Sequence, residues 1–361
     1  MTQIQTVLGS ILPEELGTTL MHEHLIVSAF NKTFVGTEKS VQPSTSRDEV
    51  DFNEPVTMNI LGLLRRNPIL CKDNSIYSDE SLAVKELNYF KEFGGKSIVE
   101  VTVKGIGRNP LALQRISKTS GLNIIAATGW YVAISHPDHV KNKTVEDLTA
   151  IMVKEIEEGI GTTGIKAGVI GEIGCSNPVP YHSEEKKVVR AAAGAQIETN
   201  AAYTIHPSLT DANKRINSVQ CADKYVDLIE KEGMNLEKFY LSHADRTSMY
   251  LDYHRKLLDR GISLGYDCFG KFYYFDTIFI GAGGVTDGDR IKAIVELCKN
   301  GYDKQIILSH DCGFKTDLRE YGGFGYAHIS RNIIPMLEDK GVSHKQIRNM
   351  MIDNPMHLLA F

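Results

Sequence analysis

Eight short apolar runs rich in strand-forming residues recur along the chain and alternate with longer segments that have helical spacing. Strands that alternate with helices form parallel sheets, because each helix carries the chain back across the sheet. An open sheet often has a glycine-rich turn after its first strand, where this chain has His22-Glu23-His24. Eight units therefore predict an α/β protein with the closed (β/α)8 TIM-barrel fold. The predicted strands are Thr18–Met21, Ser97–Val101, Asn123–Ala127, Gly168–Ile173, Ala202–His206, Phe239–His243, Ile262–Tyr266 and Gln305–Ser309.

Capping residues mark the helices between these runs. Asn109-Pro110 places a capping side chain before a proline at the first helical position, and Gly121 ends that segment. Two glutamates follow Ser183, and acidic residues are favoured at a helix start by the helix dipole. The other predicted helices are Ser78–Phe93, Thr144–Glu158, Ser218–Glu232, Thr247–Arg260 and Asp289–Asn300.

The predicted organisation is one domain over residues 1–361. With 42% hydrophobic residues, the chain has enough apolar material for one large core, and no linker rich in Pro, Gly or Ser interrupts it. One long irregular stretch, 28–77, follows the first strand and has a mixed polar composition with three prolines. We interpret it as an elaborated loop over one end of the barrel.

Charge and composition exclude several classes of protein. A net charge of −5 without any run of Lys or Arg argues against nucleic-acid binding. No apolar stretch of about 18 residues is present, so no membrane span is expected. The N-terminus lacks the features of a signal peptide, and the six cysteines form no CxxC pair, which favours reduced thiols and a cytoplasmic location. The expected partner is a small-molecule substrate, and homo-oligomerisation is left open.

His22 and His24 stand on either side of Glu23 at the end of the first predicted strand. Alternate residues of a strand point to the same side, so the two imidazoles share one face. Active sites of TIM barrels form at the carboxyl ends of the strands, where such a pair is suited to hold a metal. By itself, this HxH pattern is equally compatible with polar residues that begin a loop.

Four more metal-type side chains end other predicted strands: Glu172, His206, His243 and Asp311. Glu172 lies inside a nearly apolar strand, and a buried carboxylate without a cation is very unfavourable. Each residue separately has a simpler explanation, such as a hydrogen-bonded core histidine or a helix cap. Together with the HxH pair, they place ligand-type side chains on five strands at one end of the barrel.

Six ligands exceed the four of one tetrahedral zinc, so we predict two divalent metal ions. Glu172 would bridge them, with His22, His24 and Asp311 on one metal and His206 and His243 on the other. Several histidines with carboxylates suit Zn, Mn, Fe or Co rather than Ca or Mg.

The remaining histidines are interpreted differently. His310 is expected to face the opposite side of its strand from Asp311, and His328 to begin a helix near the mouth. Six others are interpreted as surface or packing residues without partners: His136, His139, His182, His254, His344 and His357.

With these residues assembled, the sequence resembles the phosphotriesterase branch of the amidohydrolase superfamily, most closely its animal phosphotriesterase-related subgroup. The resemblance implies a (β/α)8 barrel with a binuclear metal centre, usually zinc. It runs from end to end and is carried by Gln5-Thr6-Val7-Leu8-Gly9, Met21-His22-Glu23-His24-Leu25, Gly171-Glu172-Ile173-Gly174-Cys175-Ser176, Ser242-His243-Ala244-Asp245-Arg246-Thr247, Tyr266-Asp267-Cys268-Phe269-Gly270 and Tyr321-Gly322-Gly323-Phe324-Gly325-Tyr326.

The resemblance also implies an activity. True phosphotriesterases of this branch bridge their metals with a carboxylated lysine, where this chain has Glu172; Lys166 lies before the strand. Efficient organophosphate hydrolysis is therefore not expected. The subgroup implies hydrolysis of the amide bond of N-acyltaurines, N-acetyltaurine foremost, and of related N-acetyl amino acids.

The predicted mechanism is attack on the acyl carbon by a hydroxide shared between two metals. Asp311 would accept its proton and deliver it to the departing amine. Arg246 is the first choice to bind a sulfonate or carboxylate, unless it forms an ion pair with Asp245, and Lys104 and Arg108 are weaker choices. Tyr131 is expected to line the pocket or to pack its loop. Two alternatives remain: a lactonase, carboxylesterase or weak phosphotriesterase on the same site, and a non-catalytic protein that keeps the metals for structure.

Overall fold

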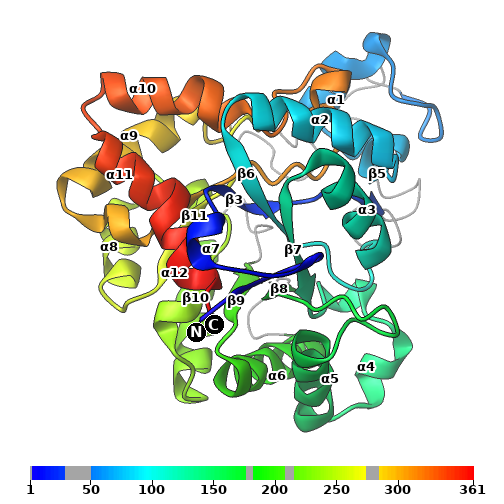
Figure 1. Cartoon of the computed structure of the whole chain (residues 1–361). Coiled ribbons are helices and arrows are strands. Elements are labelled where there is room, and N and C mark those ends of the chain that lie inside the picture. The colour runs from blue at the N-terminus through cyan, green and yellow to red at the C-terminus, as the bar shows by residue number, and fades with distance from the viewer. Residues whose placement is uncertain (1, 29–49, 176–181, 208–214, 274–283) are drawn as a thin grey trace.

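The structure, a computed structural model, has a single eight-stranded parallel sheet surrounded by helices (Figure 1). It describes residues 2–28, 50–175, 182–207, 215–273 and 284–361. The predicted TIM-barrel fold is confirmed, and each predicted strand lies within two residues of an observed one. The strands are β3 (Thr18–Glu23), β6 (Gly95–Glu100), β7 (Asn123–Thr128), β8 (Val169–Gly174), β9 (Ala202–His206), β10 (Phe239–Leu241), β11 (Ser263–Tyr266) and β12 (Ile306–Leu308).

The barrel closes where the first strand, β3, meets the last, β12. The backbone N–H of Asp311 donates to the carbonyl of His22 at 3.1 Å. The hydroxyl of Ser309 accepts from the backbone N–H of His22 at 3.0 Å. This seam therefore joins the HxH pair directly to the segment that carries Asp311.

Residues that face the barrel interior alternate with residues that face the helices. The interior forms its own apolar cluster, to which seven strands contribute, among others, Met21, Val99, Ile125, Val169, Ala202, Tyr240 and Ile307. Their neighbours along the strands, such as Leu20, Ile98 and Ile124, belong to a second cluster that includes the inner faces of the helices. This packing fills the barrel and leaves the strand ends for polar side chains.

Helices cover the outside of the barrel, and side-chain caps determine several of their ends. Asn109 accepts from Ala112 N, and Gly121 ends the same helix with φ 72°. Thr144 and Asp147 form a capping box. The helices are α2 (Glu80–Glu92), α3 (Pro110–Ser120), α4 (Asp138–Asn142), α5 (Val145–Glu157), α6 (Ser183–Thr199), α7 (Arg215–Lys231), α8 (Leu251–Leu258), α9 (Asp287–Lys299), α10 (Ile334–Asp339), α11 (His344–Arg348) and α12 (Asn354–Leu359).

One predicted helix, Thr247–Arg260, begins too early. Residues Ala244–Thr247 form a short 3-10 helix, η8, and α8 begins only at Leu251. The hydroxyl of Thr247 donates to the carbonyl of Ala244 at 2.8 Å, so Thr247 ends a turn instead of starting a helix. The spacing of apolar residues in the sequence does not distinguish this turn from the first turn of a helix.

Two small sheets were not predicted from the sequence, because their strands have only two or three residues and lack the longer apolar runs that mark the barrel strands. β1 (Ile4–Thr6) and β2 (Gly9–Ile11) form an N-terminal hairpin. β4 (Val27–Ser28) pairs with β5 (Ile76–Tyr77), which brings together the two ends of the segment 28–77. That segment includes α1 (Leu61–Arg66), and its residues 29–49 lie outside the described part of the chain.

The two ends of the chain lie side by side (Figure 1). Gln3 and Phe361 exchange backbone hydrogen bonds at 3.2 and 3.0 Å. Among the described residues, no helix combines the length and the apolar character that a membrane span requires.

Candidate metal centre

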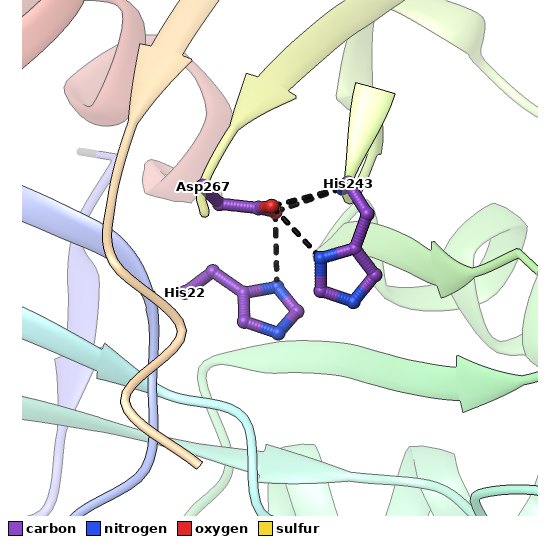
Figure 2. Close-up of side chains that lie close together, drawn as sticks. All are labelled: His22, His243 and Asp267. Atoms are coloured by element: carbon purple, nitrogen blue, oxygen red, sulfur yellow. Dashed lines mark hydrogen bonds and ion pairs between the residues drawn. The ribbon is translucent and has the colours of Figure 1, made fainter. Parts of the chain in front are cut away.

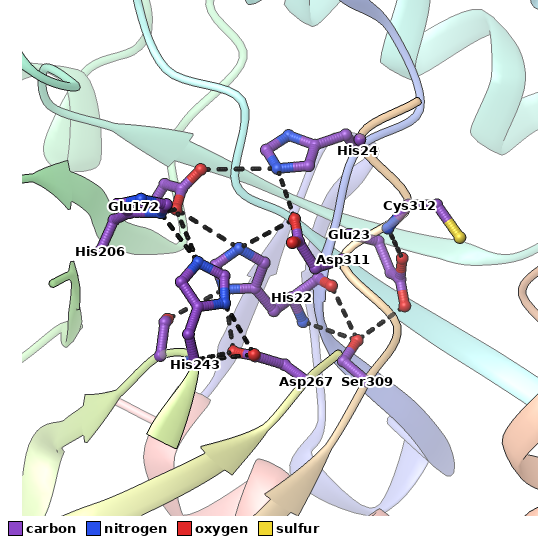
Figure 3. Close-up of polar contacts among 12 residues, drawn as sticks. His22, Glu23, His24, Glu172, His206, His243, Asp267, Ser309, Asp311 and Cys312 are labelled. Carbon is purple, nitrogen blue, oxygen red and sulfur yellow. Dashed lines mark hydrogen bonds and ion pairs between the residues drawn. The ribbon is translucent and has the colours of Figure 1, made fainter. Parts of the chain in front are cut away.

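The structure brings the six predicted ligand residues together at the carboxyl ends of the barrel strands (Figure 3). Three of them lie in β3, β8 and β9, and the other three lie in the segments that follow β3, β10 and β12. All six side chains are almost completely buried, the most exposed being His206 at 12%. The residues are His22, His24, Glu172, His206, His243 and Asp311.

Potential ligand atoms fall into two groups that meet at Glu172. In the first group, Asp311 Oδ1 lies 3.7 Å from His22 Nε2 and 3.3 Å from His24 Nε2. Glu172 reaches this group with both oxygens, each 3.5 Å from one of the two imidazole nitrogens. Two ligands about 2.1 Å from a tetrahedral zinc lie on the order of 3.4 Å apart, so these spacings fit a shared ion.

The second group consists of Glu172, His206 and His243. Glu172 Oε2 lies 2.9 Å from His206 Nδ1 and 3.7 Å from His243 Nε2. The same nitrogen of His206 lies 2.8 Å from His243 Nε2. Glu172 therefore stands between the two groups, which is the position that a bridging carboxylate needs.

Two of these residues adopt a left-handed backbone conformation. His243 has φ 57° and Asp311 has φ 54°, a region that residues other than glycine rarely occupy. Among the described residues, Asn200, at the end of α6, is the only other non-glycine residue with positive φ. Such conformations often occur at functional sites. The sequence analysis placed His243 at the end of its strand, but β10 already ends at Leu241.

Asp267, which follows β11, is the main site residue that the sequence analysis missed as a functional residue. Its Oδ1 lies 2.8 Å from His243 Nδ1, and both its oxygens accept from the backbone N–H of His243 at 3.0 Å (Figure 2). Oδ2 also lies 3.5 Å from His22 Nδ1. The available signal was its position, because it directly follows the seventh predicted strand as the ligand-type residues follow others.

Hydrogen bonds to the ring nitrogens that face away from the centre of the site orient the imidazoles. His24 Nδ1 lies 2.8 Å from the hydroxyl of Thr102, which itself donates to the buried carboxylate of Glu100. The hydroxyl oxygen therefore accepts from His24 Nδ1–H, which turns Nε2 toward Glu172 and Asp311. Burial raises the pKa of Glu100 to about 7.

His22 supplies the most direct indication that the site suits a cation. Its Nδ1 lies 2.9 Å from the hydroxyl of Ser242. Its Nε2 is buried and has no hydrogen-bond partner among the residues that the structure describes. A ring nitrogen that is buried in this way and faces two carboxylates fits a metal ion, and the mixed nitrogen and oxygen donors suit Zn, Mn, Fe or Co.

The carboxylates of the site favour their ionised form. Burial alone would raise the pKa of Glu172, but His206 and His22 hold it well below its usual range. Burial likewise opposes ionisation of Asp311, but Lys271 and His24 lower its pKa well below the ordinary value. The site therefore concentrates negative charge where the imidazole nitrogens converge.

The predicted substrate-binding residues lie beside this cluster. Tyr131 places its hydroxyl 3.0 Å from His206 Nε2. Arg246 does not pair with Asp245, because that carboxylate is held by Arg290 at 2.5 Å. Within the described part of the chain, Arg246 has no carboxylate at ion-pair distance, and its Nε donates to Cys268 Sγ at 3.5 Å.

Two other predictions about charged residues are corrected. Arg108 forms a bidentate pair with Glu155 at 2.6 and 2.8 Å, so its guanidinium is already occupied. Several of the histidines interpreted as having no partner do have one. His136 Nε2 lies 2.7 Å from the carbonyl oxygen of Tyr131, and His344 Nδ1 lies 2.9 Å from Glu338 Oε1. His254 is completely buried and lies 3.0 Å from the hydroxyl of Thr247 and 2.9 Å from that of Tyr266. Its helical position concealed these contacts because both partners come from loop and strand segments.

Histidines and carboxylates at the mouth of a TIM barrel are typical of metal-dependent hydrolases. A model of the Phosphotriesterase family matches residues 2–359, and the chain belongs to this family. It is thus a hydrolase of a metal-dependent family, and several of its buried groups could hold a metal.

Named relatives cover nearly the whole chain. The chain is 36% identical over 360 residues to the N-acetyltaurine hydrolase of Salmo salar, a match that covers 99% of this chain and 98% of that protein. The N-acetyltaurine hydrolase of Homo sapiens is 33% identical, with the same coverage of 99% and 98%. Among solved structures, a resiniferatoxin-binding protein from Rhodobacter sphaeroides has a TM-score of 0.88 and 33% identity, with coverage of 99% of this chain and 94% of that chain.

Proposed function

We propose that this chain hydrolyses the amide bond of small N-acyl compounds, namely N-acetyltaurine and related N-acyltaurines or N-acetyl amino acids. The relatives from Salmo salar and Homo sapiens that carry the name N-acetyltaurine hydrolase support this substrate class. The observation that carries the proposal is the convergence of two ligand groups on Glu172, with the cation of Arg246 attached to the neighbouring loop.

The site would hold two divalent metals, with zinc as the first expectation and manganese, iron or cobalt as alternatives. His22, His24 and Asp311 would hold one, His206 and His243 the other, and Glu172 would contact both. When bound, such metals polarise a carbonyl oxygen and lower the pKa of a water toward about 7.

Asp311 is the proposed general base and acid. Its Oδ1 faces His24 and its Oδ2 faces Lys271, so the carboxylate spans from the ligand group to the mouth. It accepts the proton of the attacking water and passes it to the nitrogen of the leaving amine. Transfer of this kind contributes roughly 10²–10⁴ in rate. An amide needs it more than an ester does, because an amide anion is a poor leaving group.

Arg246 and Tyr131 are the proposed substrate contacts. A guanidinium without a carboxylate partner can form two parallel hydrogen bonds with a sulfonate or carboxylate of the substrate. The hydroxyl of Tyr131 lies at His206, where it can donate to the acyl oxygen.

The proposal is tested by metal analysis together with a substrate panel. Purified protein is assayed on N-acetyltaurine, N-acetyl amino acids, lactones and paraoxon, before and after chelation. We expect two metal ions per chain, fastest hydrolysis of N-acetyltaurine, loss of activity on chelation and recovery on adding zinc. Faster hydrolysis of lactones or paraoxon would favour the esterase alternative, and bound metal without any hydrolysis would favour a binding protein.

Asp311→Asn tests the proposed proton transfer. We expect kcat for N-acetyltaurine to fall by roughly 10²–10⁴, because an amide side chain cannot carry the proton. Steady-state kinetics and metal analysis are measured on the same preparation. Asp252→Asn is the control, since that side chain is 93% exposed on α8. Unchanged activity of Asp311→Asn with metals bound would exclude the assigned role.

A further inference from the structure

A second cation, Lys271, lies at the site on the segment that follows β11. Its Nζ lies 2.5 Å from Asp311 Oδ2, and the side chain is only 10% exposed. An ammonium group has three N–H donors. Among the described residues, Asp311 is its only hydrogen-bond acceptor, which leaves two donors for a bound molecule.

Arg246 contacts the same segment. Its Nε donates to the sulfur of Cys268, three residues before Lys271. In the part of the chain that the structure describes, neither of its terminal nitrogens donates to a protein acceptor. Arg246 and Lys271 lie close enough to interact electrostatically with each other and with Asp311, so both cations border the same part of the site.

A buried network fixes both segments from behind. Asp245, the residue before Arg246, accepts from the backbone N–H of Cys268 at 3.1 Å and from Arg290 at 2.5 Å. Asp287 accepts from the backbone N–H of Gly270 at 3.0 Å. The segments that carry the two cations are thus held in place before any ligand arrives, which lowers the entropic cost of binding.

The charge balance favours an anion. Burying cationic donors without acceptors is unfavourable, so their presence implies an acceptor that arrives with the substrate. Among the described residues, Asp311 is the only carboxylate at ion-pair distance from Lys271, and none lies that close to Arg246; Asp245 and Asp317 act on the two cations only from farther away. A neutral leaving group would leave these donors unsatisfied after water has been displaced.

From these contacts we infer that Lys271 and Arg246 together form a subsite for the sulfonate of the leaving group, and that Lys271 determines the preference for sulfonate over carboxylate. The guanidinium fork takes two oxygens and the ammonium takes the third. A carboxylate has only two oxygens, so it cannot offer two oxygens to the guanidinium of Arg246 and a third to the ammonium of Lys271. The inference rests on the proposed amide hydrolysis and specifies its substrates as N-acyl aminosulfonates.

Three substrates of nearly equal size test this subsite. N-acetyltaurine carries a sulfonate, N-acetyl-β-alanine a carboxylate and N-propylacetamide no charge. For the unaltered holoenzyme we expect kcat/KM to decrease in that order. In Lys271→Met, we expect the ratio of N-acetyltaurine to N-acetyl-β-alanine to fall at least tenfold. In Arg246→Met, both anionic substrates should lose at least tenfold relative to the neutral one.

Lys315→Met is the matched control, because Lys315 lies on the next loop and is paired with Asp73 at 2.6 Å. Its substrate ratios should equal those of the unaltered protein. Thermal unfolding of each variant shows whether it folds. A proportional loss on all three substrates in Lys271→Met would overturn the inference, because Lys271 would then serve only to orient Asp311.

Calorimetric binding of ethanesulfonate and propionate to the holoenzyme gives a readout that does not require turnover. Ethanesulfonate should bind more tightly than propionate, and at least tenfold more weakly to Lys271→Met. If no amide is hydrolysed but ethanesulfonate binds in this pattern, the proposed function fails and the subsite stands. If amides are hydrolysed without preference for an anion, the subsite fails and the proposed function stands.

Discussion

The imidazoles of the site are held by carboxylates and hydroxyls that do not themselves belong to the predicted ligand set. Asp267 contacts both the side chain and the backbone N–H of His243, and it also approaches His22. A carboxylate in this position fixes the orientation of the ring and makes its other nitrogen a better donor. Asp267 therefore links the two ligand groups from the side of β11.

Asp267→Asn is expected to weaken metal binding while the fold is kept. The substitution preserves shape, but it removes the charge and one of the two acceptor oxygens. Loss of such a contact typically costs 10–100-fold in metal affinity. Competition with a zinc chelator measures the affinity, and Asp259→Asn, in a pair with Tyr302 on the surface, is the control. Equal zinc affinity of Asp267→Asn and the unaltered protein would show that Asp267 does not support the ligands.

The individual residues of the candidate site were predicted from their positions near the ends of the strands. His22, Glu172 and His206 lie at or near the ends of their strands and His24 directly follows β3, so their positions along the strands were enough to place them at one end of the barrel. Lys271 was missed because its position depends on the path of a loop, which no periodicity describes. The partners of charged residues could not be predicted either: among the described residues Arg246 has no carboxylate partner, because Arg290, 44 positions further along the chain, holds Asp245.

Among the secondary-structure elements, α9 has an anchoring role beyond covering the barrel. Arg290 in its first turn is 3% exposed and contacts Asp245 at 2.5 Å and Asp287 at 3.1 Å. Asp287 in turn lies 2.8 Å from His328, near the start of the C-terminal helices. This buried network joins the segments after β10, β11 and β12.

Arg290→Met is expected to lower the free energy of unfolding by about 3–5 kcal/mol, because it leaves two buried carboxylates without their cation. Chemical denaturation of chelated protein measures the change. Arg255→Met on α8 is the control, since its partner Asp252 is 93% exposed and surface pairs contribute less than about 1 kcal/mol. Equal costs for the two substitutions would contradict a structural role for the network.

Length alone did not decide which elements could be predicted, because the three-residue strands β10 and β12 were predicted and the short helices α1, α4, α10, α11 and α12 were not. Apolar alternation located all eight barrel strands, and caps such as Thr144 and Gly121 located helix ends. β10 ends two residues before the end that the sequence predicted. The backbone N–H of His243 donates to the carboxylate of Asp267 and is therefore not available to a neighbouring strand. A contact between distant segments decides that boundary.

For the molecule as a whole, a buried neutral histidine makes stability depend on pH. Burial lowers the pKa of His254 to about 4, below the ordinary value of 6.5. Between these values the unfolded chain binds a proton that the folded chain excludes. Stability contributed by this residue is therefore complete above about pH 6.5, declines as the pH falls and levels off near pH 4.

His254→Gln should flatten this acid dependence. The difference between the two pKa values corresponds to on the order of 3 kcal/mol, which the variant should no longer lose between pH 7 and pH 4. Denaturation at several pH values is followed in the presence of a chelator, so that metal release does not contribute. His344→Gln is the control, because that side chain is 94% exposed. If both variants show the acid dependence of the unaltered protein, His254 is not its source.

The fold class was predictable because eight repeats of one local pattern are compatible with few architectures. The pairing of β4 with β5 at the two ends of the segment 28–77 was not predictable, because it depends on tertiary contacts. That residues 1–361 form a single domain stays a prediction.

The seam between β3 and β12 also has a consequence for the order in which the protein is assembled. The ribosome synthesises His22 and His24 before Glu172, His206 and His243, and Asp311 after all of them. A growing chain can assemble Glu172, His206 and His243 earlier, but the first ligand group stays incomplete until the last barrel strand has been synthesised and docked. The proposed binding of two metal ions is therefore expected only after β12 has been synthesised and docked.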